Sequence, residues 1–190
     1  MKQKVWAKTL LSSYTCLERV ASAIDKMVLD KGINSAFDNR STLRQTDRII
    51  GLIQRKKMLI NAKIIVENAI SKLKENELNI IVLRYFDKVK CVDIAQLLDV
   101  SMRTYFRRLS LAINNVARNL TNLGFTDEVL SSMLGDDPWF DRLYKAIYAR
   151  ELNGKKDNLE EDFCELKLLN MAYSSYKNEK FNNYTGFAVC

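Results

Sequence analysis

The residues best suited to chemistry in this chain are arginines in its middle third. Between residues 101 and 118 there are four arginines and no acidic side chain. Arg103 and Arg107 are four residues apart, so on a helix they share one face. A guanidinium group donates paired hydrogen bonds to guanine edges or to phosphate oxygens. The spacing indicates a surface for nucleic acid, and a solvated arginine face without function is the alternative.

Two helices joined by a turn at residues 98–101 are predicted to position these arginines. The apolar set of this unit is Ile94, Ala95, Leu98, Val100, Tyr105 and Leu109. Ala95 is small where the two helices must cross closely, and Ser101 is a favourable N-cap for the second helix. An apolar-faced helix, a turn and a cationic second helix are the parts of a helix-turn-helix that enters the major groove.

The residues expected to contact DNA lie before and along the second helix. Its start offers backbone N–H groups and a positive dipole end to a phosphate. Arg103 and Arg107 are the side chains that we expect in the groove. The whole expected set is Lys88, Lys90, Ser101, Met102, Arg103, Thr104, Phe106, Arg107 and Arg108.

Several short motifs resemble region four of bacterial sigma factors, with the extracytoplasmic-function type most similar. They are Leu83-Arg-Tyr-Phe, Ile94-Ala-Gln-Leu-Leu, Val100-Ser-x-x-Thr104 and Arg108-Leu109-x-x-Ala112. The run Ser101-Met-Arg-Thr-Tyr-Phe-Arg is also similar to one in sigma-like phage regulators of the ArpU type. The resemblance covers about residues 75–120. It implies a module that binds a promoter element and contacts RNA polymerase.

One residue departs from the usual turn of such a unit. Asp99 stands where glycine commonly makes the turn. Aspartate tolerates the left-handed backbone conformation better than most residues do. We therefore expect the turn to form at a modest cost.

The distribution of charge agrees with this position of the module. Residues 40–120 hold 16 Lys/Arg against 7 Asp/Glu, a net charge of +9, within a chain whose total is +7. Residues 121–190 hold 8 against 12, a net charge of −4. A basic excess around the helix-turn-helix suits a phosphate-binding surface. The acidic part is expected either to pack against the basic module or to contact a partner. Charge alone does not distinguish these two possibilities.

Composition predicts an all-α fold, because one proline and six glycines in 190 residues leave long stretches without helix breakers. We expect a helical bundle with a long central helix and a helix-turn-helix module in the C-terminal half. The predicted domains are an N-terminal helical scaffold (1–74), the module (75–122) and an acidic C-terminal helical segment (123–190).

Apolar spacing and capping residues predict the individual helices. A first helix over 2–29 should end before Gly32, with a connector at 33–40. Thr126 and Asp137-Pro138 are start signals for two later helices. The other predicted helices are 42–73, capped by Ser41, then 75–86, and a last one over 159–176.

Isoleucines give the predicted helix at 42–73 a wide apolar side. They are Ile49, Ile50, Ile53, Ile60, Ile64 and Ile70. In a heptad frame, one of the two seam positions is occupied by Leu43, Ile50, Lys57 and Ile64, which puts a lysine in the seam. Glu67 falls at the second seam position. The pattern is compatible with a homodimeric coiled coil, but packing against the chain's own helices is the favoured interpretation.

No catalytic, metal or cofactor site is expected. Histidine is absent, and Cys16, Cys91, Cys164 and Cys190 form no CxxC pair, which favours buried thiols in a reduced, cytoplasmic protein. The acidic clusters 136–137 and 160–162 are better explained as helix starts. No glycine-rich phosphate loop is present, so an enzyme is not expected. No signal peptide and no apolar run of roughly 18 residues is found, so no membrane partner is expected.

Two classes of function remain. The leading one is a cytoplasmic bacterial or phage transcription regulator that binds double-stranded DNA and contacts RNA polymerase. The alternative is a protein-interaction adaptor that uses the helix-turn-helix as a docking surface, with Met102 and Phe106 interleaved among arginines. Counterion release predicts that DNA affinity falls steeply with salt, whereas an apolar docking surface predicts a shallow response.

Overall fold

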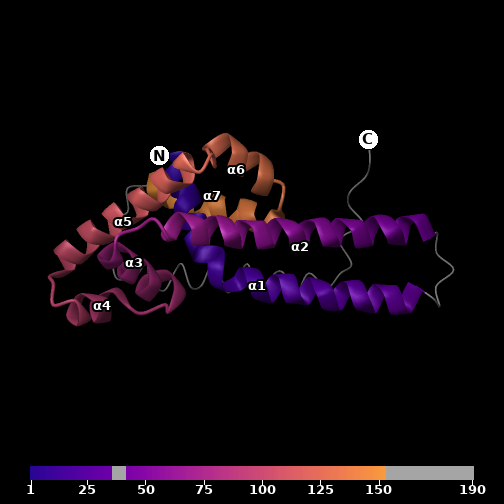
Figure 1. Cartoon of the computed structure of the whole chain (residues 1–190), viewed down its shortest axis with the longest axis horizontal. Coiled ribbons are helices and arrows are strands. Elements are labelled where there is room, and N and C mark those ends of the chain that lie inside the picture. The colour runs from indigo at the N-terminus through magenta and orange to yellow at the C-terminus, as the bar shows by residue number, and fades with distance from the viewer. Residues whose placement is uncertain (36–41, 153–190) are drawn as a thin grey trace.

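The computed structural model describes residues 1–35 and 42–152, and the side chains of 1–30 and 46–152. Every regular element in this part is helical, which confirms the predicted all-α class (Figure 1). The elements are α1 (Lys2–Ser35), α2 (Thr42–Ile70), α3 (Glu75–Ile81), the π-helical turn η1 (Val82–Phe86), α4 (Cys91–Leu97), α5 (Met102–Asn122), α6 (Asp127–Leu134) and α7 (Pro138–Leu152).

Helices α1 and α2 form a long antiparallel hairpin that extends to one side of the molecule (Figure 1). Three polar pairs join them at successive levels: Tyr14 to Glu67 (2.8 Å), Lys63 to Glu18 (3.0 Å) and Lys56 to Asp25 (2.6 Å). Burial and the hydrogen bond to Glu67 raise the pKa of the Tyr14 phenol, which therefore stays protonated and donates. These pairs agree with the alignment set by the buried apolar side chains that the two helices share.

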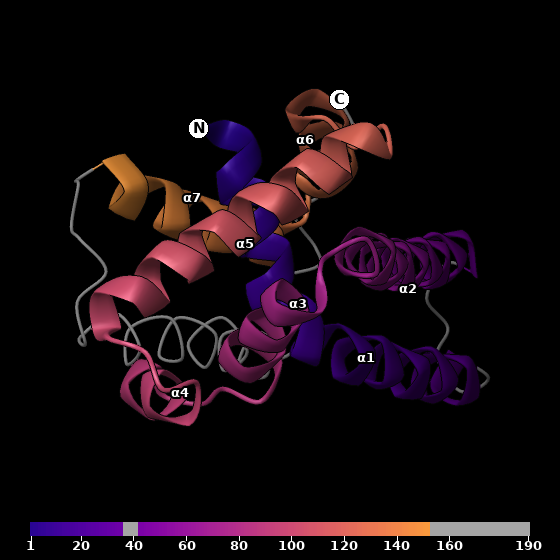
Figure 2. The same ribbon diagram turned by 60° about the vertical axis from the view of Figure 1, so that its left-hand side comes forward.

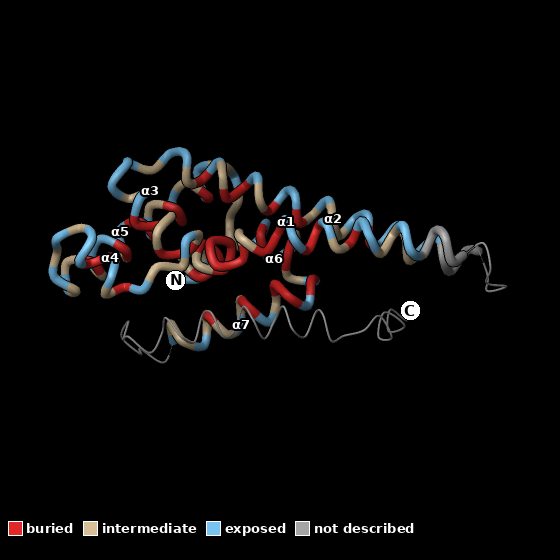
Figure 3. Tube along the Cα trace, turned by 90° about the horizontal axis from the view of Figure 1, so that it is seen from below, coloured by how far each residue is buried: buried red, intermediate tan, exposed pale blue. Residues whose placement is uncertain are grey.

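One apolar cluster contains residues from all of the helices from α1 to α7. The N-terminal half of α1 lies at its centre, where α5 and α7 both pack on it (Figure 2). The buried stretches gather at this meeting point, whereas exposed residues recur along the hairpin (Figure 3). Each predicted segment, 1–74, 75–122 and the described part of 123–190, contributes side chains to this shared core.

Two predicted helix ends are wrong. Helix α1 continues through Gly32 to Ser35, so the predicted connector does not begin at residue 33. A single glycine within a helix costs only about 1 kcal/mol, which the rest of a long helix can offset. Helix α2 ends at Ile70, before the predicted end at residue 73. The Ser41 cap and the helix predicted at 159–176 lie outside the described residues.

The sequence favours packing of the α2 isoleucines against the chain's own helices. In the structure, not all of them pack there. Ile50, Ile53, Ile60 and Ile64 are 42–50% exposed. The inward face is formed instead by Leu52, Leu59, Ala62, Ile65, Val66 and Ala69. This helix is apolar over two arcs, and only one of them meets the core.

Both predicted start signals in the C-terminal half are confirmed. The Thr126 hydroxyl accepts a hydrogen bond from Val129 N (3.5 Å) at the start of α6. Asp137 Oδ1 accepts from Trp139 N (2.9 Å) and Phe140 N (3.3 Å) at the start of α7. Each side chain satisfies backbone donors that the first helical turn leaves open.

Three described carboxylates of α6 and α7 pair with α1 and α2 and not with the arginines at the start of α5. Asp127 accepts from Trp6 Nε1 (3.0 Å), and Asp137 lies 2.7 Å from Arg55 Nε. Glu151 pairs with Lys8 (2.6 Å) and Lys4 (3.5 Å). The described acidic residues that pair across helices thus hold α6 and α7 against the scaffold.

We expect the pairing of Glu151 to make stability depend on acid pH. Burial acts to raise the pKa of this carboxyl, but Lys8 and Lys4 outweigh it, so the folded pKa lies below the ordinary 4.5. Its contribution is therefore present above pH 4.5 and lost as pH falls through the lowered pKa. In urea titrations, Glu151→Gln should cost less than about 1 kcal/mol at pH 7. The deficit should shrink towards pH 3, and a constant deficit would contradict the assignment.

Candidate nucleic-acid interface

The turn between α4 and α5 is closed by two backbone hydrogen bonds. Val100 N donates to Ala95 O (3.0 Å), and Asp99 N donates to Gln96 O (3.0 Å). Asp99 has a φ of +48°, the left-handed conformation expected for it. This bonding pattern is the Schellman motif, in which the residue after the helix end turns left-handed. Asp99 therefore does here what glycine commonly does, and the bend at residues 98–101 is tight.

Ser101 is the N-cap of α5, as predicted. Its hydroxyl accepts from Thr104 N (3.2 Å) and lies 3.0 Å from the Thr104 hydroxyl. Its carbonyl accepts from Tyr105 N (2.9 Å). The N–H groups of Met102 and Arg103 precede these bonds and stand at the positive end of the helix dipole.

The predicted apolar set of the unit forms part of the core. Ile94 and Tyr105 have no exposed surface, Ala95 is 4% exposed and Leu109 is 7% exposed. Leu98 and Val100 are partly buried and pack on the same cluster. These side chains hold α4 against α5 and η1, and α5 against α3 and α1, so the outer face of α5 has a fixed orientation.

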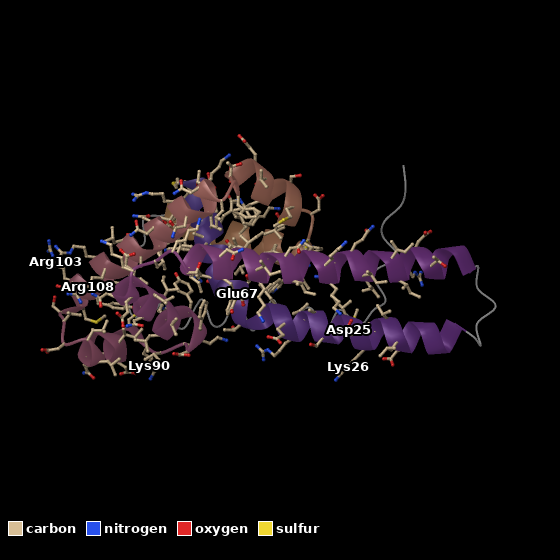
Figure 4. All side chains as sticks on the ribbon, viewed as in Figure 1. Asp25, Lys26, Glu67, Lys90, Arg103 and Arg108 are labelled. Carbon is tan, nitrogen blue, oxygen red and sulfur yellow. The ribbon has the colours of Figure 1, made fainter. Side chains whose placement is uncertain are left out.

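Arg103, Arg107 and Arg108 are exposed, and the start of α5 lies at the end of the molecule opposite to the hairpin tip (Figure 4). None of the ion pairs between described side chains includes any of these three arginines. The side chains of Met102, Thr104 and Phe106 are half-buried. The centroid of the Phe106 ring lies 5.2 Å from that of the Tyr105 ring. The three arginines are thus accessible, and the apolar members of the predicted set mainly support the helix.

The two predicted lysines lie in the segment that leads into α4. Lys90 is exposed and directly precedes α4, on the same end of the molecule as Arg103 and Arg108 (Figure 4). Lys88 is half-buried and has a φ of +56°. Val89 N donates to Leu83 O (2.9 Å), which ties this link to η1. Lys90 is therefore the more accessible of the two.

The exposed face of α5 is longer than the sequence interpretation had assigned. Leu111, Asn114 and Arg118 are exposed and continue the face of Arg103 and Arg107. Their spacing from Arg107 by 4, 7 and 11 residues is the signal that could have identified them. Leu111 is 53% exposed, and Leu97 at the end of α4 is 71% exposed. The surface is thus cationic with isolated apolar side chains.

Other types of site are not found in the described part of the chain. No three of its Cys, Asp and Glu residues are grouped as a metal site would require. The thiols of Cys16 and Cys91 are buried, as expected. Over residues 1–35 and 42–152, no helix has both the length and the apolar character needed to cross a membrane.

Comparison with known proteins adds no functional information. No family model, no curated protein and no solved structure matches this chain.

Proposed function

We propose that this protein is a cytoplasmic, sequence-specific DNA-binding regulator of transcription that inserts the start of α5 into the major groove. The observation that carries this proposal is the accessible arginine face at the start of a helix that a tight turn and a buried Tyr105 hold in place. In a helix-turn-helix, the N-terminal residues of the second helix contact base edges while the first helix lies over the backbone.

The chemistry of each group suits a distinct role in this complex. Arg103 and Arg107 would donate paired hydrogen bonds to guanine edges in the groove. Arg108, Lys90 and the N–H groups at the start of α5 would bind phosphates that fix the register on the duplex. The resemblance to sigma region four adds contact with RNA polymerase as a proposed second step.

Selection from random duplex DNA, followed by affinity measurements on the enriched sequence, tests the proposal. With about five phosphate contacts, log affinity should fall with log salt at a slope of about −4.5. Affinity should then drop roughly 500-fold between 50 and 200 mM salt. A scrambled duplex should bind at least about 10³-fold more weakly than the enriched one. Failure to enrich any sequence would contradict the proposal.

The adaptor remains the second candidate because Leu111 is exposed on the arginine face and Leu97 is exposed at the end of α4. An acidic partner with apolar side chains would suit such a surface. Binding of that kind would give a salt slope near −1 or shallower, and Leu97→Ala and Leu111→Ala would weaken it most. These substitutions are expected to change DNA affinity less than about 3-fold, so they separate the two candidates.

A further inference from the structure

The outward arc of α2 is an apolar stripe with regular spacing. We use the name isoleucine stripe for Ile50, Ile53, Ile60 and Ile64, which are 46%, 50%, 42% and 47% exposed. Their separations of 3, 7 and 4 residues follow a heptad, with Lys57 at the remaining position of the seam. The stripe is about 21 Å long at about 1.5 Å per residue.

The described side chains leave the stripe 42–50% exposed, whereas the opposite face of α2 holds the buried residues Leu52, Leu59, Ala62, Ile65, Val66 and Ala69. Single exposed apolar residues are ordinary, but a contiguous row of them marks an interaction surface. The four half-exposed isoleucines amount to roughly 300–400 Å² of apolar surface, comparable to the largest patch on a typical monomer. Among the described side chains of the hairpin, residues 1–30 and 46–70, only the stripe combines this area with a heptad.

We infer that the isoleucine stripe is a dimerisation surface, on which α2 of a second copy of this chain packs antiparallel. A second copy supplies the same heptad, so isoleucine meets isoleucine along the seam. Two stripes together bury roughly 700 Å² of apolar surface, and the flanking polar side chains bring the interface close to the lower limit of about 1,200 Å² for specific complexes. This area suits a dimer with a dissociation constant in the micromolar range.

Lys57 determines the orientation of the two helices. In a parallel pair, equivalent positions face each other, so the two Lys57 ammonium groups would meet in the seam and repel. In an antiparallel pair, the heptad position of Lys57 faces the position of Ile53 and Ile60, so each lysine stem packs on isoleucine and its ammonium group reaches solvent. Glu67 does not enter the seam in this arrangement, because Tyr14 holds its carboxylate on the α1 side.

Measuring the mass of the full chain in solution tests dimerisation without reference to DNA. Between 5 and 200 µM protein, light scattering should show a rise from the monomer mass of 22.0 kDa towards twice that value. The double variant Ile53→Lys/Ile60→Lys should weaken the dimer at least 100-fold. Leu29→Lys on α1 and Leu97→Lys on α4 replace leucines that are 64% and 71% exposed, and should leave it unchanged.

Lys57→Ile provides the opposite change, because it removes the one charge from the seam. This variant should tighten the dimer about 10-fold or more, and helical content by circular dichroism should stay unchanged in every variant. A wild-type chain that remains monomeric at 200 µM would overturn the inference. So would a dimer that appears only after residues 153–190 are deleted, since that result would identify the chain's own C-terminal segment as the occupant.

A spin label at position 68 tests the orientation. Asn68 is exposed on α2 beyond the stripe. In the antiparallel dimer, two labels on Asn68→Cys should be separated by about 30–40 Å along the helices. A parallel dimer would bring them within about 15 Å, since packed helices lie 8–10 Å apart. Cys164 and Cys190 are replaced by serine for this measurement, and a short distance would overturn the antiparallel arrangement.

Discussion

Arg103→Ala and Arg107→Ala are each expected to weaken binding to the selected duplex about 10- to 100-fold. Each guanidinium group is exposed at the start of α5, where a recognition helix contacts base edges. Loss of a bidentate contact with guanine costs about 1–3 kcal/mol. Titration of labelled duplex at a fixed salt concentration measures the effect, and the double variant should lose most of the preference for the selected sequence.

Controls on the same chain separate base reading from general attraction. Lys26→Ala removes the same unit of charge from an exposed position on α1 and should change affinity less than 2-fold (Figure 4). Arg103→Lys keeps the charge but loses the planar fork, so it should relax sequence preference and preserve the salt slope. Arg108→Ala should weaken all duplexes equally and reduce the slope by about 1. Equal effects at Lys26 and Arg103 would contradict a specific interface.

The second large effect is expected at Asp137, where Asp137→Ala should lower the free energy of unfolding by about 2–4 kcal/mol. One of its carboxylate oxygens caps α7 through Trp139 N and Phe140 N, and the other lies 2.7 Å from Arg55 Nε. The Asp137 side chain is 3% exposed and that of Arg55 is 12% exposed, so water replaces little of what is lost. Urea titration followed by circular dichroism measures the change.

Two neighbouring changes isolate the cause of this effect. Asp136→Ala alters the adjacent exposed carboxylate and should change stability by less than about 0.5 kcal/mol. Asp137→Asn can keep the cap but not the charge, so its cost should lie between those of the other two variants. A cost under about 1 kcal/mol for Asp137→Ala would contradict this assignment. The Arg55 pair and the α7 cap would then contribute less to the free energy of unfolding than their geometry indicates.

Features that depend on a few neighbouring residues could be predicted from the sequence. The Ser101 cap, the Thr126 cap and the start of α7 at Asp137-Pro138 were all anticipated and are confirmed. The left-handed Asp99 belongs to the same group. In each case, one side chain or one backbone angle decides the structure, and the amino acids concerned have strong local preferences.

Other features depend on which surfaces meet, and periodicity does not encode that. Helix α2 has apolar side chains on two arcs, and nothing local distinguishes the arc of Leu59 and Val66 from that of Ile53 and Ile60. Charge alone does not show whether the acidic residues of α6 and α7 pack against the basic module or contact a partner. The structure pairs Asp137 with Arg55 of α2. That choice follows from where α7 packs.

The sequence by itself determined that the chain is helical, where the turn at residues 98–101 falls and which arginines follow it. These depend on side-chain spacing and on backbone preferences within a few residues. Only the tertiary structure decided that α6 and α7 pack on α1, that three of their described carboxylates pair with α1 and α2 and not with the arginines at the start of α5, and that Ile53 and Ile60 face outward. Burial is a property of packed helices, so it is settled by contacts between residues far apart in the chain.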